Sequence, residues 1–278
     1  MTPDTPSDPL LQRVELPRGS ASYTAEGAGH PVVAVHGLPG SARDWRWLGA
    51  ALGDQVRFVR LELPGFGDTP LDTEPGASLA ARGDFVAEVT RALGLEGAVL
   101  LGHSMGGGVA TAAAARHPGL YAGLGLLASV GPQPHNSLRP ILLQRHLVSA
   151  LLRLPPVATR AAPRLRREFE RMGFKGYTDA QHVHAMHCVA AMHFRVHRRH
   201  LDALRLPTLV AWTADDRLVE DAVGEALYWR TPHGPRVRFA TGGHNLQKTR
   251  AVELAQALVA WTGQLHAPLR VSARPAEA

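Results

Sequence analysis

Short apolar runs alternate with helix-like patterns along most of the chain. The runs are rich in Val and Leu and predict buried strands at residues 32–35, 56–61, 98–101, 124–128, 208–212 and 237–240. Apolar residues near three- and four-residue spacing predict helices at residues 79–93, 105–116 and 252–265. Residues 12–26 show short apolar alternation broken at Pro17, Arg18 and Gly19, which predicts a hairpin of antiparallel strands. Strands that alternate with helices favour a mostly parallel sheet with helices on both faces.

The alternation stops between residues 131 and 206. This stretch has helical segments, no convincing strand pattern, and proline breaks at Pro132, Pro134, Pro155, Pro156 and Pro163. We therefore expect a helical insertion, residues 131–206, that forms a lid over the sheet. The core would then consist of residues 1–130 and 207–265. Residues 266–278 carry two prolines and little periodicity, so we expect a disordered tail there.

Length and composition fit one compact unit with an inserted subdomain. The 278 residues are 45% hydrophobic, which is enough for one sizeable core. No run approaches the ~20 uninterrupted apolar residues that a membrane helix requires. Residues 1–9 hold three prolines, two aspartates and no positive side chain, a pattern unlike a secretory signal and typical of a short disordered leader. Cys188 is the only cysteine, so no intramolecular disulfide forms and the expected location is the cytoplasm.

The net charge of +6 does not indicate a nucleic-acid partner, because arginine is spread along the chain. Two local clusters remain, and a solvated helix face explains such clusters more often than a nucleic-acid site does. They are Arg164, Arg166, Arg167 and Arg171, then Arg195, Arg198 and Arg199. We expect a small-molecule substrate and neither nucleic acid nor membrane as a partner, with an acidic substrate as a minor alternative. The sequence carries no signal for an oligomeric state.

The strongest chemical feature is a Gly-x-Ser-x-Gly pattern at residues 102–106, after an apolar strand and before an Ala- and Gly-rich helix. A serine in such a turn is strained and presented to solvent, and Gly102 and Gly106 avoid collisions with neighbouring backbone. The helix N-terminus places N–H groups beside the substrate oxygen that becomes negative, and the Met105 N–H is the expected first donor of an oxyanion hole. The pattern alone also occurs in ordinary glycine-rich turns; the strand and helix around it favour a nucleophile, Ser104.

A second loop supports this interpretation. Residues 36–40, His-Gly-Leu-Pro-Gly, directly follow the predicted strand 32–35. This is the position of the loop that supplies the second N–H of an oxyanion hole, and we assign that donor to Leu38. Without the serine pattern the same residues would be an ordinary Gly/Pro loop.

A serine hydroxyl needs a base within hydrogen-bond reach and an acid that orients the base. Among 15 histidines, His244 lies just after the last predicted strand and before the last helix, where the base is expected. Asp215 and Asp216 both follow the strand 208–212, and either could be the acid. His193 and His197 have metal-like i, i+4 spacing, but no carboxylate accompanies them, so we predict no metal site.

Taken together, these segments resemble the α/β-hydrolase fold family, specifically its lidded branch of esterases, carbon-carbon bond hydrolases and metal-free haloperoxidase-like proteins. The resemblance covers residues 31–265 and rests on matches in the family's order at residues 36–40, 63–67, 102–107, Asp216 and Gly243-His244. It implies an eight-stranded sheet. The family's acid loop is a strand followed by Gly-x-x-Asp, which selects Asp216 with Thr213 in the glycine position. Glu220 also departs from the family, where proline is common at this position.

The resemblance implies a serine hydrolase that cleaves an ester or related acyl bond of a small, largely apolar substrate through an acyl-enzyme. Its catalytic residues would be Ser104, Asp216 and His244, with no cofactor, since neither a Walker loop nor a dinucleotide fingerprint is present. Halide displacement and epoxide opening usually employ an aspartate nucleophile, so Ser104 argues against both. Carbon-carbon, thioester and amide hydrolysis and perhydrolysis remain open, because each runs on the same residues. The alternative from another functional class is a non-catalytic protein that binds a small ligand. Trp45 and Trp47 either line a pocket or pack elsewhere.

Overall fold

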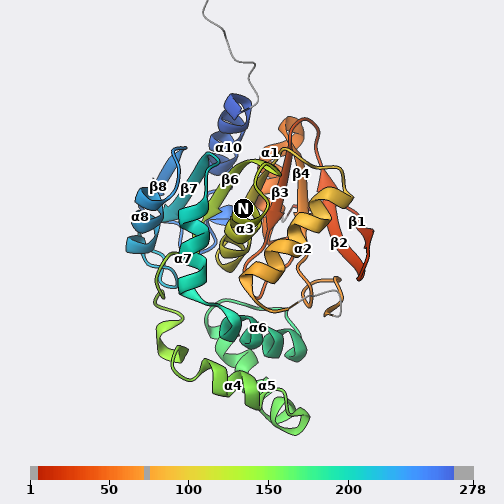
Figure 1. Ribbon diagram of the computed structural model, residues 1–278, viewed down its shortest axis with the longest axis vertical. Helices are drawn as coiled ribbons and strands as arrows, with labels where there is room; N and C mark the ends of the chain where they lie inside the picture. Colours follow the sequence, from red (N-terminus) through yellow and green to blue (C-terminus); the bar gives the residue numbers. More distant parts are fainter. Residues whose placement is uncertain (1–5, 72–75, 266–278) are drawn as a thin grey trace, which may run out of the picture.

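A single sheet forms the centre of the computed structural model, which describes residues 6–71 and 76–265 (Figure 1). Within these residues the sheet has eight strands in the order β1-β2-β4-β3-β5-β6-β7-β8. β1 and β2 form an antiparallel hairpin, β2 pairs antiparallel with β4, and all other neighbours are parallel. The predicted hairpin and the predicted eight-stranded, mostly parallel α/β-hydrolase sheet are thereby confirmed.

The bounds of the elements are as follows. The strands are β1 (Leu11–Leu16), β2 (Gly19–Glu26), β3 (Pro31–Val35), β4 (Arg57–Leu61), β5 (Ala98–His103), β6 (Tyr121–Leu127), β7 (Thr208–Thr213) and β8 (Arg236–Phe239). The α-helices are α1 (Arg46–Leu52), α2 (Leu79–Ala92), α3 (Met105–Arg116), α4 (Arg145–Leu151), α5 (Pro155–Arg171), α6 (Asp179–Ala191), α7 (Phe194–Ala203), α8 (Asp221–Arg230), α9 (Leu246–Thr249) and α10 (Ala251–Leu265).

Some elements differ from the sequence-based expectations, and the short helices α1 and α9 were not predicted. β8 is not a buried strand: it pairs with β7 alone and lies at the sheet edge, where Arg238 is exposed and forms an ion pair with Asp221. Val237 and Phe239 pack against the second apolar cluster and Arg238 between them is exposed, so only one face of this strand is apolar. The helix α8 was not predicted, because its sequence mixes apolar, acidic and glycine positions. Its Gly224 lets the backbone pack directly against the ring of Trp212.

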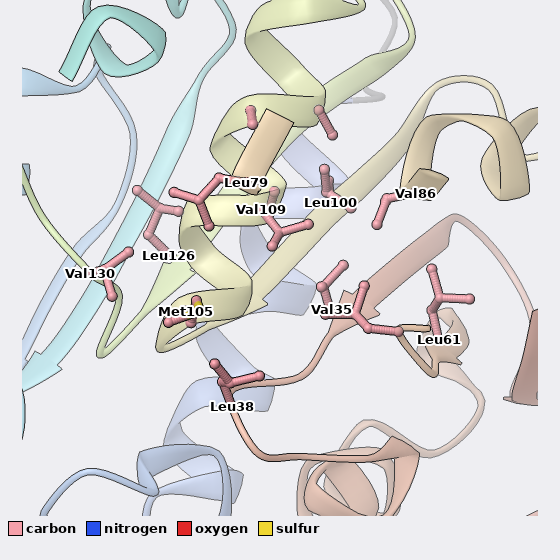
Figure 2. Packing of buried hydrophobic residues seen from close by; sticks show 14 of the residues in the cluster. Val35, Leu38, Leu61, Leu79, Val86, Leu100, Met105, Val109, Leu126 and Val130 are labelled. Atoms are coloured by element: carbon pink, nitrogen blue, oxygen red, sulfur yellow. The ribbon is translucent and has the colours of Figure 1, made fainter. Parts of the chain in front are cut away.

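The sheet separates two apolar clusters. Successive residues of a strand point to opposite faces, so Val33 and Val35 belong to one cluster and Val32 and Ala34 to the other. The first cluster contains residues of α2, α3 and α8, and the second contains residues of α1 and α10. Figure 2 shows the first cluster, which continues past the end of the sheet to Leu38, Met105 and Val130. The core therefore reaches the loops where the candidate chemistry lies.

Residues 131–206 contain α4, α5, α6 and α7 and no strand in the structure. Figure 1 shows α4, α5 and α6 gathered at one end of the molecule, away from α10. Pro155 and Pro156 begin α5, as expected of prolines in a first turn, whereas Pro163 lies inside α5 and does not end it. The two arginine clusters are exposed, the first on α5 and the second on α7.

Within residues 6–71 and 76–265, no helix is both long and apolar enough to cross a membrane. The predicted tail, residues 266–278, lies outside the described residues, as does the first half of the predicted leader, residues 1–5.

We expect opposite effects from the same substitution in two helices. A Cβ atom on Gly83 of α2 would lie 2.7 Å from the backbone nitrogen of Ala113 in α3, whereas a Cβ on Gly263 of α10 meets nothing within 4 Å. Gly83→Ala should therefore lower the free energy of unfolding by about 1–3 kcal/mol, through overpacking. Gly263→Ala should raise it by up to about 1 kcal/mol, through helix propensity. Urea unfolding of both variants measures this, and a stabilised Gly83→Ala protein would contradict the close packing of α2 on α3.

Candidate active site

Ser104 lies in the turn between β5 and α3, with φ 56° and ψ −124°. A positive φ is uncommon for a residue other than glycine and is retained only where the surroundings enforce it. A Cβ atom on Gly102 would lie 2.5 Å from the carbonyl oxygen of Gly106, and a Cβ on Gly106 would overlap the carbonyl oxygens of Val35 and His36. Both flanking positions therefore require glycine, for the reason that the sequence indicated.

His244 bridges the other two predicted residues. Its Nδ1 lies 2.8 Å from Oδ2 of Asp216, and its Nε2 lies 2.9 Å from Oγ of Ser104. A carboxylate can only accept, so Nδ1 carries the hydrogen and Nε2 is left to accept from the serine hydroxyl. Ser104 thus forms one hydrogen-bonded chain with two residues that lie more than a hundred positions away in the sequence.

Asp216 is held as a charged acceptor. Its other oxygen, Oδ1, accepts hydrogen bonds from the backbone N–H groups of Leu218 at 2.8 Å and Val219 at 3.0 Å. Burial by itself raises the pKa of this carboxyl, but the hydrogen bond and charge of His244 and the two N–H groups together hold it below its ordinary value. Asp216 is therefore ionised near neutral pH and can stabilise an imidazolium at His244.

The neighbouring carboxylate, Asp215, has a different position. It accepts hydrogen bonds from the N–H groups of Gly242 at 3.2 Å and Gly243 at 2.8 Å, immediately before His244. Thr213, which stands in the family's glycine position, donates its hydroxyl to the carbonyl of Gly243 at 3.0 Å. The threonine at position 213 thus adds a second connection between the loop that carries Asp216 and the loop that carries His244.

The other departure from the family pattern, Glu220, ties the acid loop to the helical segment. Its carboxylate accepts from the backbone N–H of Asn136 at 2.8 Å and from the guanidinium of Arg139 at 2.5 Å. Leu218 in the same loop accepts from the N–H of Ser137 at 3.2 Å. The start of residues 131–206 is therefore bound to the loop that carries Asp216.

The loop at residues 36–40 lies against the serine. A Cβ atom on Gly37 would lie 3.1 Å from Cβ of Ser104, so the two backbones pass very close together. His36 holds this loop: its Nδ1 donates to the Gly37 carbonyl at 2.8 Å, and its Nε2 accepts from the Leu63 N–H at 3.0 Å. Leu38 and Met105 both line the cavity above Ser104, and Figure 2 shows them on the two separate segments predicted to supply oxyanion donors.

His103, which the sequence interpretation did not single out, contacts His244. Its Nε2 donates to the backbone carbonyl of His244 at 2.9 Å, and the two ring centroids are 4.9 Å apart. Burial and the charge of His244 lower the pKa of His103 to about 3, so this ring stays neutral. Its position between Gly102 and Ser104 was visible in the sequence, but its contact with residue 244 depends on the fold.

Ser104 and His244 open into an apolar cavity of about 240 Å³. Much of its wall comes from residues 131–206, including Leu138, Ile141, Leu165, Phe169, Met172, Phe174, Met186 and Val189. A second, more polar cavity of about 110 Å³ touches Ser104 from the side of Gly37, Lys175 and Asn245. The arrangement can accommodate a small, largely apolar molecule with a reacting group at the serine.

The remaining sequence candidates lie away from this cavity. Trp45 is fully buried and packs edge-on against Phe58, and Trp47 lies beneath the ammonium group of Lys248. His197 is buried with Nε2 3.3 Å from the Val130 carbonyl, whereas His193 is exposed. Within the described ranges, no group of three or more His, Cys, Asp or Glu side chains is placed to hold a metal ion.

Comparison with known proteins gives matches over most of the chain. Residues 32–257 match the sequence model of the Alpha/beta hydrolase family. The chain is 27% identical over 263 residues to a 2-hydroxy-6-oxononadienedioate/2-hydroxy-6-oxononatrienedioate hydrolase of Paraburkholderia phymatum, covering 87% of this chain and 90% of the relative. A thermophilic esterase from Thermogutta terrifontis superposes with a TM-score of 0.68 at 25% identity, covering 92% of this chain and 99% of the esterase.

Another set of relatives is longer than this chain. A dihydrolipoyllysine-residue acetyltransferase component of the acetoin cleaving system from Pseudomonas putida is 26% identical over 248 residues, which cover 84% of this chain and 63% of the relative. The corresponding component from Cupriavidus necator matches over 29% of its own length. The chain therefore spans less than two thirds of these acetyltransferase components.

We expect stability to fall with acidification because of the buried histidines beside the site. Burial lowers the pKa of His36 to about 4 and of His103 to about 3, from about 6.5 in an unfolded chain. Between these pKa values the unfolded state binds the proton and the folded state does not. The free energy of unfolding is therefore highest above pH 6.5 and falls as the pH decreases. Each of the two histidines lowers the free energy of unfolding by up to roughly 2 kcal/mol between pH 6.5 and pH 5.

Urea unfolding at both pH values measures this loss, and His36→Gln should make it smaller. His146→Gln, at an exposed position, serves as the control and should leave it unchanged. An unfolding free energy of the parent protein that is the same at pH 6.5 and pH 5 would contradict the neutral, buried state of these rings.

Proposed function

The chain belongs to the alpha/beta hydrolase family, and from this premise we propose that it hydrolyses an ester or related acyl bond of a small, largely apolar substrate. One observation supports this proposal above all others. The continuous hydrogen-bonded chain from Ser104 through His244 to Asp216 opens directly into an apolar cavity. A nucleophile, a base and an orienting carboxylate in this order are the components of serine hydrolysis.

In the first half of the reaction, Ser104 Oγ attacks the substrate carbonyl and His244 Nε2 takes its proton. The carbonyl oxygen becomes negative, and the backbone N–H groups of Leu38 and Met105 stabilise it as an oxyanion hole. His244 then gives the proton to the leaving alcohol, the bond between the carbonyl carbon and the leaving oxygen breaks, and an acyl group remains on Ser104. Asp216 stabilises the imidazolium throughout and does not take the proton itself.

In the second half, water replaces the alcohol. His244 takes a proton from the water as it attacks the acyl carbon, and Ser104 recovers a proton from His244 when the carboxylic acid leaves. The scheme needs no cofactor, since every proton is carried by His244 and every negative charge is met by an N–H donor or the imidazolium.

Residues 131–206 would act as the lid that selects the substrate. They provide much of the cavity wall, and Glu220 and Leu218 bind their first residues to the acid loop. Apolar lining favours acyl or alkyl groups over charged ones, because a charge in the cavity would lose its hydration.

Carbon-carbon bond hydrolysis is the second candidate, and one observation favours it: the match to the Paraburkholderia phymatum hydrolase covers 87% of this chain. The same nucleophile, base and oxyanion donors would serve that reaction, so the two candidates differ only in substrate. Turnover of a vinylogous diketone in preference to aryl esters would select this candidate.

We expect a fluorophosphonate probe to add once to the protein, because a serine activated by a histidine attacks the phosphorus atom. Intact-mass measurement should show a single adduct, and Ser104→Ala should abolish it. Ser129→Ala gives a matched control: Ser129 is a buried serine whose hydroxyl donates to the Val130 carbonyl and should not react. A folded protein that shows no adduct would favour the non-catalytic binder.

Substitution of the two adjacent aspartates should separate their roles. Asp216→Asn replaces the acceptor of the His244 Nδ1 hydrogen and should lower kcat on an aryl ester by roughly 10³- to 10⁴-fold. Asp215→Asn keeps an oxygen that can accept from Gly243 and should lower kcat by less than about tenfold. The reverse order of effects in steady-state kinetics would show that Asp215 is the acid.

A further inference from the structure

His135 is a polar residue in the otherwise apolar wall of the cavity. It follows β6 at the start of the helical segment, lines the same cavity as Ser104 and His244, and is 5% exposed. A buried imidazole normally finds partners for both ring nitrogens, because an unpaired polar atom in an apolar environment costs free energy. The partners of its two nitrogens therefore indicate what this residue does.

One edge of the ring is anchored to the protein. Nδ1 lies 3.0 Å from the backbone carbonyl of Leu218 in the acid loop and 2.9 Å from the hydroxyl oxygen of Ser137. A carbonyl oxygen cannot donate, so Nδ1 must carry the hydrogen. This fixes the tautomer, and the second nitrogen, Nε2, is left with a lone pair that can only accept.

The other edge of the ring has no partner. Nε2 is buried and makes no hydrogen bond among the residues that the structure describes. Burial lowers the pKa of His135 to about 4, so Nε2 stays unprotonated near neutral pH and cannot serve as a cationic site.

The other polar side chains that line the cavity have partners. The hydroxyl of Ser104 and the ring of His244 are bound to each other, the hydroxyl of Ser137 contacts Nδ1 of His135, and Oε1 of Glu168 accepts from Arg171 at 2.6 Å. Nε2 of His135 is the unpaired acceptor on a residue that lines this cavity.

We propose that Nε2 of His135 accepts a hydrogen bond from a hydroxyl group of the substrate, so that the preferred substrates are esters whose apolar portion carries one hydroxyl. The inference rests on the function proposed above and specifies its substrate class. His135 would be a specificity-determining residue, since it touches the substrate but takes no part in bond cleavage. A substrate that lacks the hydroxyl leaves Nε2 unpaired, and it is rejected for that reason.

Matched ester pairs test this inference directly. Each pair consists of para-nitrophenyl esters of a hexanoyl chain with either a hydroxyl or a methyl group on the second, third or last carbon. A reciprocal set places the hydroxyl on a hexyl alcohol esterified with acetate, with heptyl acetate as its methyl counterpart. The hydroxyl and the methyl have similar size, so a difference in kcat/KM within a pair reports the hydrogen bond. We expect at least one pair to favour the hydroxyl by roughly 5- to 100-fold.

Two variants separate substrate recognition from anchoring of the acid loop. In His135→Asn the amide nitrogen takes the place of Nδ1 and can still donate to Leu218, but nothing occupies the position of Nε2. In His135→Gln the amide oxygen can reach the position of Nε2, while the donor to Leu218 is lost. The hydroxyl preference should fall to about one in His135→Asn and persist in part in His135→Gln. A purely structural role would give the opposite pattern: unchanged preference in the Asn variant and equal loss on both esters in the Gln variant.

Equal kcat/KM within every pair, or a preference that survives in His135→Asn, would overturn the inference. Calorimetric binding to Ser104→Ala distinguishes this failure from failure of the proposed function, because it needs no turnover. If the parent protein hydrolyses none of the esters, the proposed function has failed. Tighter binding of one hydroxylated ester to Ser104→Ala than to Ser104→Ala/His135→Asn still supports recognition by His135, and equal binding removes it.

Discussion

The close approach of the first turn of α3 to the loop after β3 is the constraint on which the site depends. Gly106 lies directly on the carbonyl groups of Val35 and His36, and Gly37 lies against Ser104. A side chain at Gly106 would overlap these carbonyl groups and one at Gly37 would crowd Cβ of Ser104, so the serine is packed tightly between the helix N-terminus and the loop that carries Leu38. Each segment with an expected oxyanion donor is thereby held in place by packing.

Much of the sheet and part of the site could be predicted from the sequence, because those features are local. The apolar runs of β3, β5 and β7 are short, and a glycine or an aspartate follows each strand within three residues. Gly102 reports a steric requirement of the turn itself, whereas the requirement at Gly106 comes from its contact with Val35 and His36. His244 was located by its place after the last predicted strand, and Asp216 was selected over Asp215 by the resemblance to the family's acid loop; the structure joins both in one hydrogen-bonded chain to Ser104. Their catalytic roles stay predictions until they are tested.

The remaining features depend on contacts between distant segments, which carry no periodic signal. Asp215 and Thr213 hold the turn before His244, about 30 positions away, and nothing in their own neighbourhood indicates this. Glu220 departs from the family pattern in the sequence, and the backbone N–H that its carboxylate binds lies 84 positions earlier, at Asn136. Likewise, the proline at position 163 predicted a break, whereas the packing of α5 tolerates it inside the helix.

The bonds that join Glu220 and Leu218 to residues 135–139 also limit how this protein can be recombined with its relatives. A helical segment transplanted at residue 131 without an arginine at position 139 would lose the contact of that guanidinium with Glu220. A segment whose backbone departs from that of residues 136 and 137 would also lose the two N–H groups that donate to Glu220 and Leu218. An exchange of this segment should therefore begin after residue 139. Residues 135–139 are part of the insertion in the sequence, but their contacts are with the loop that carries Asp216.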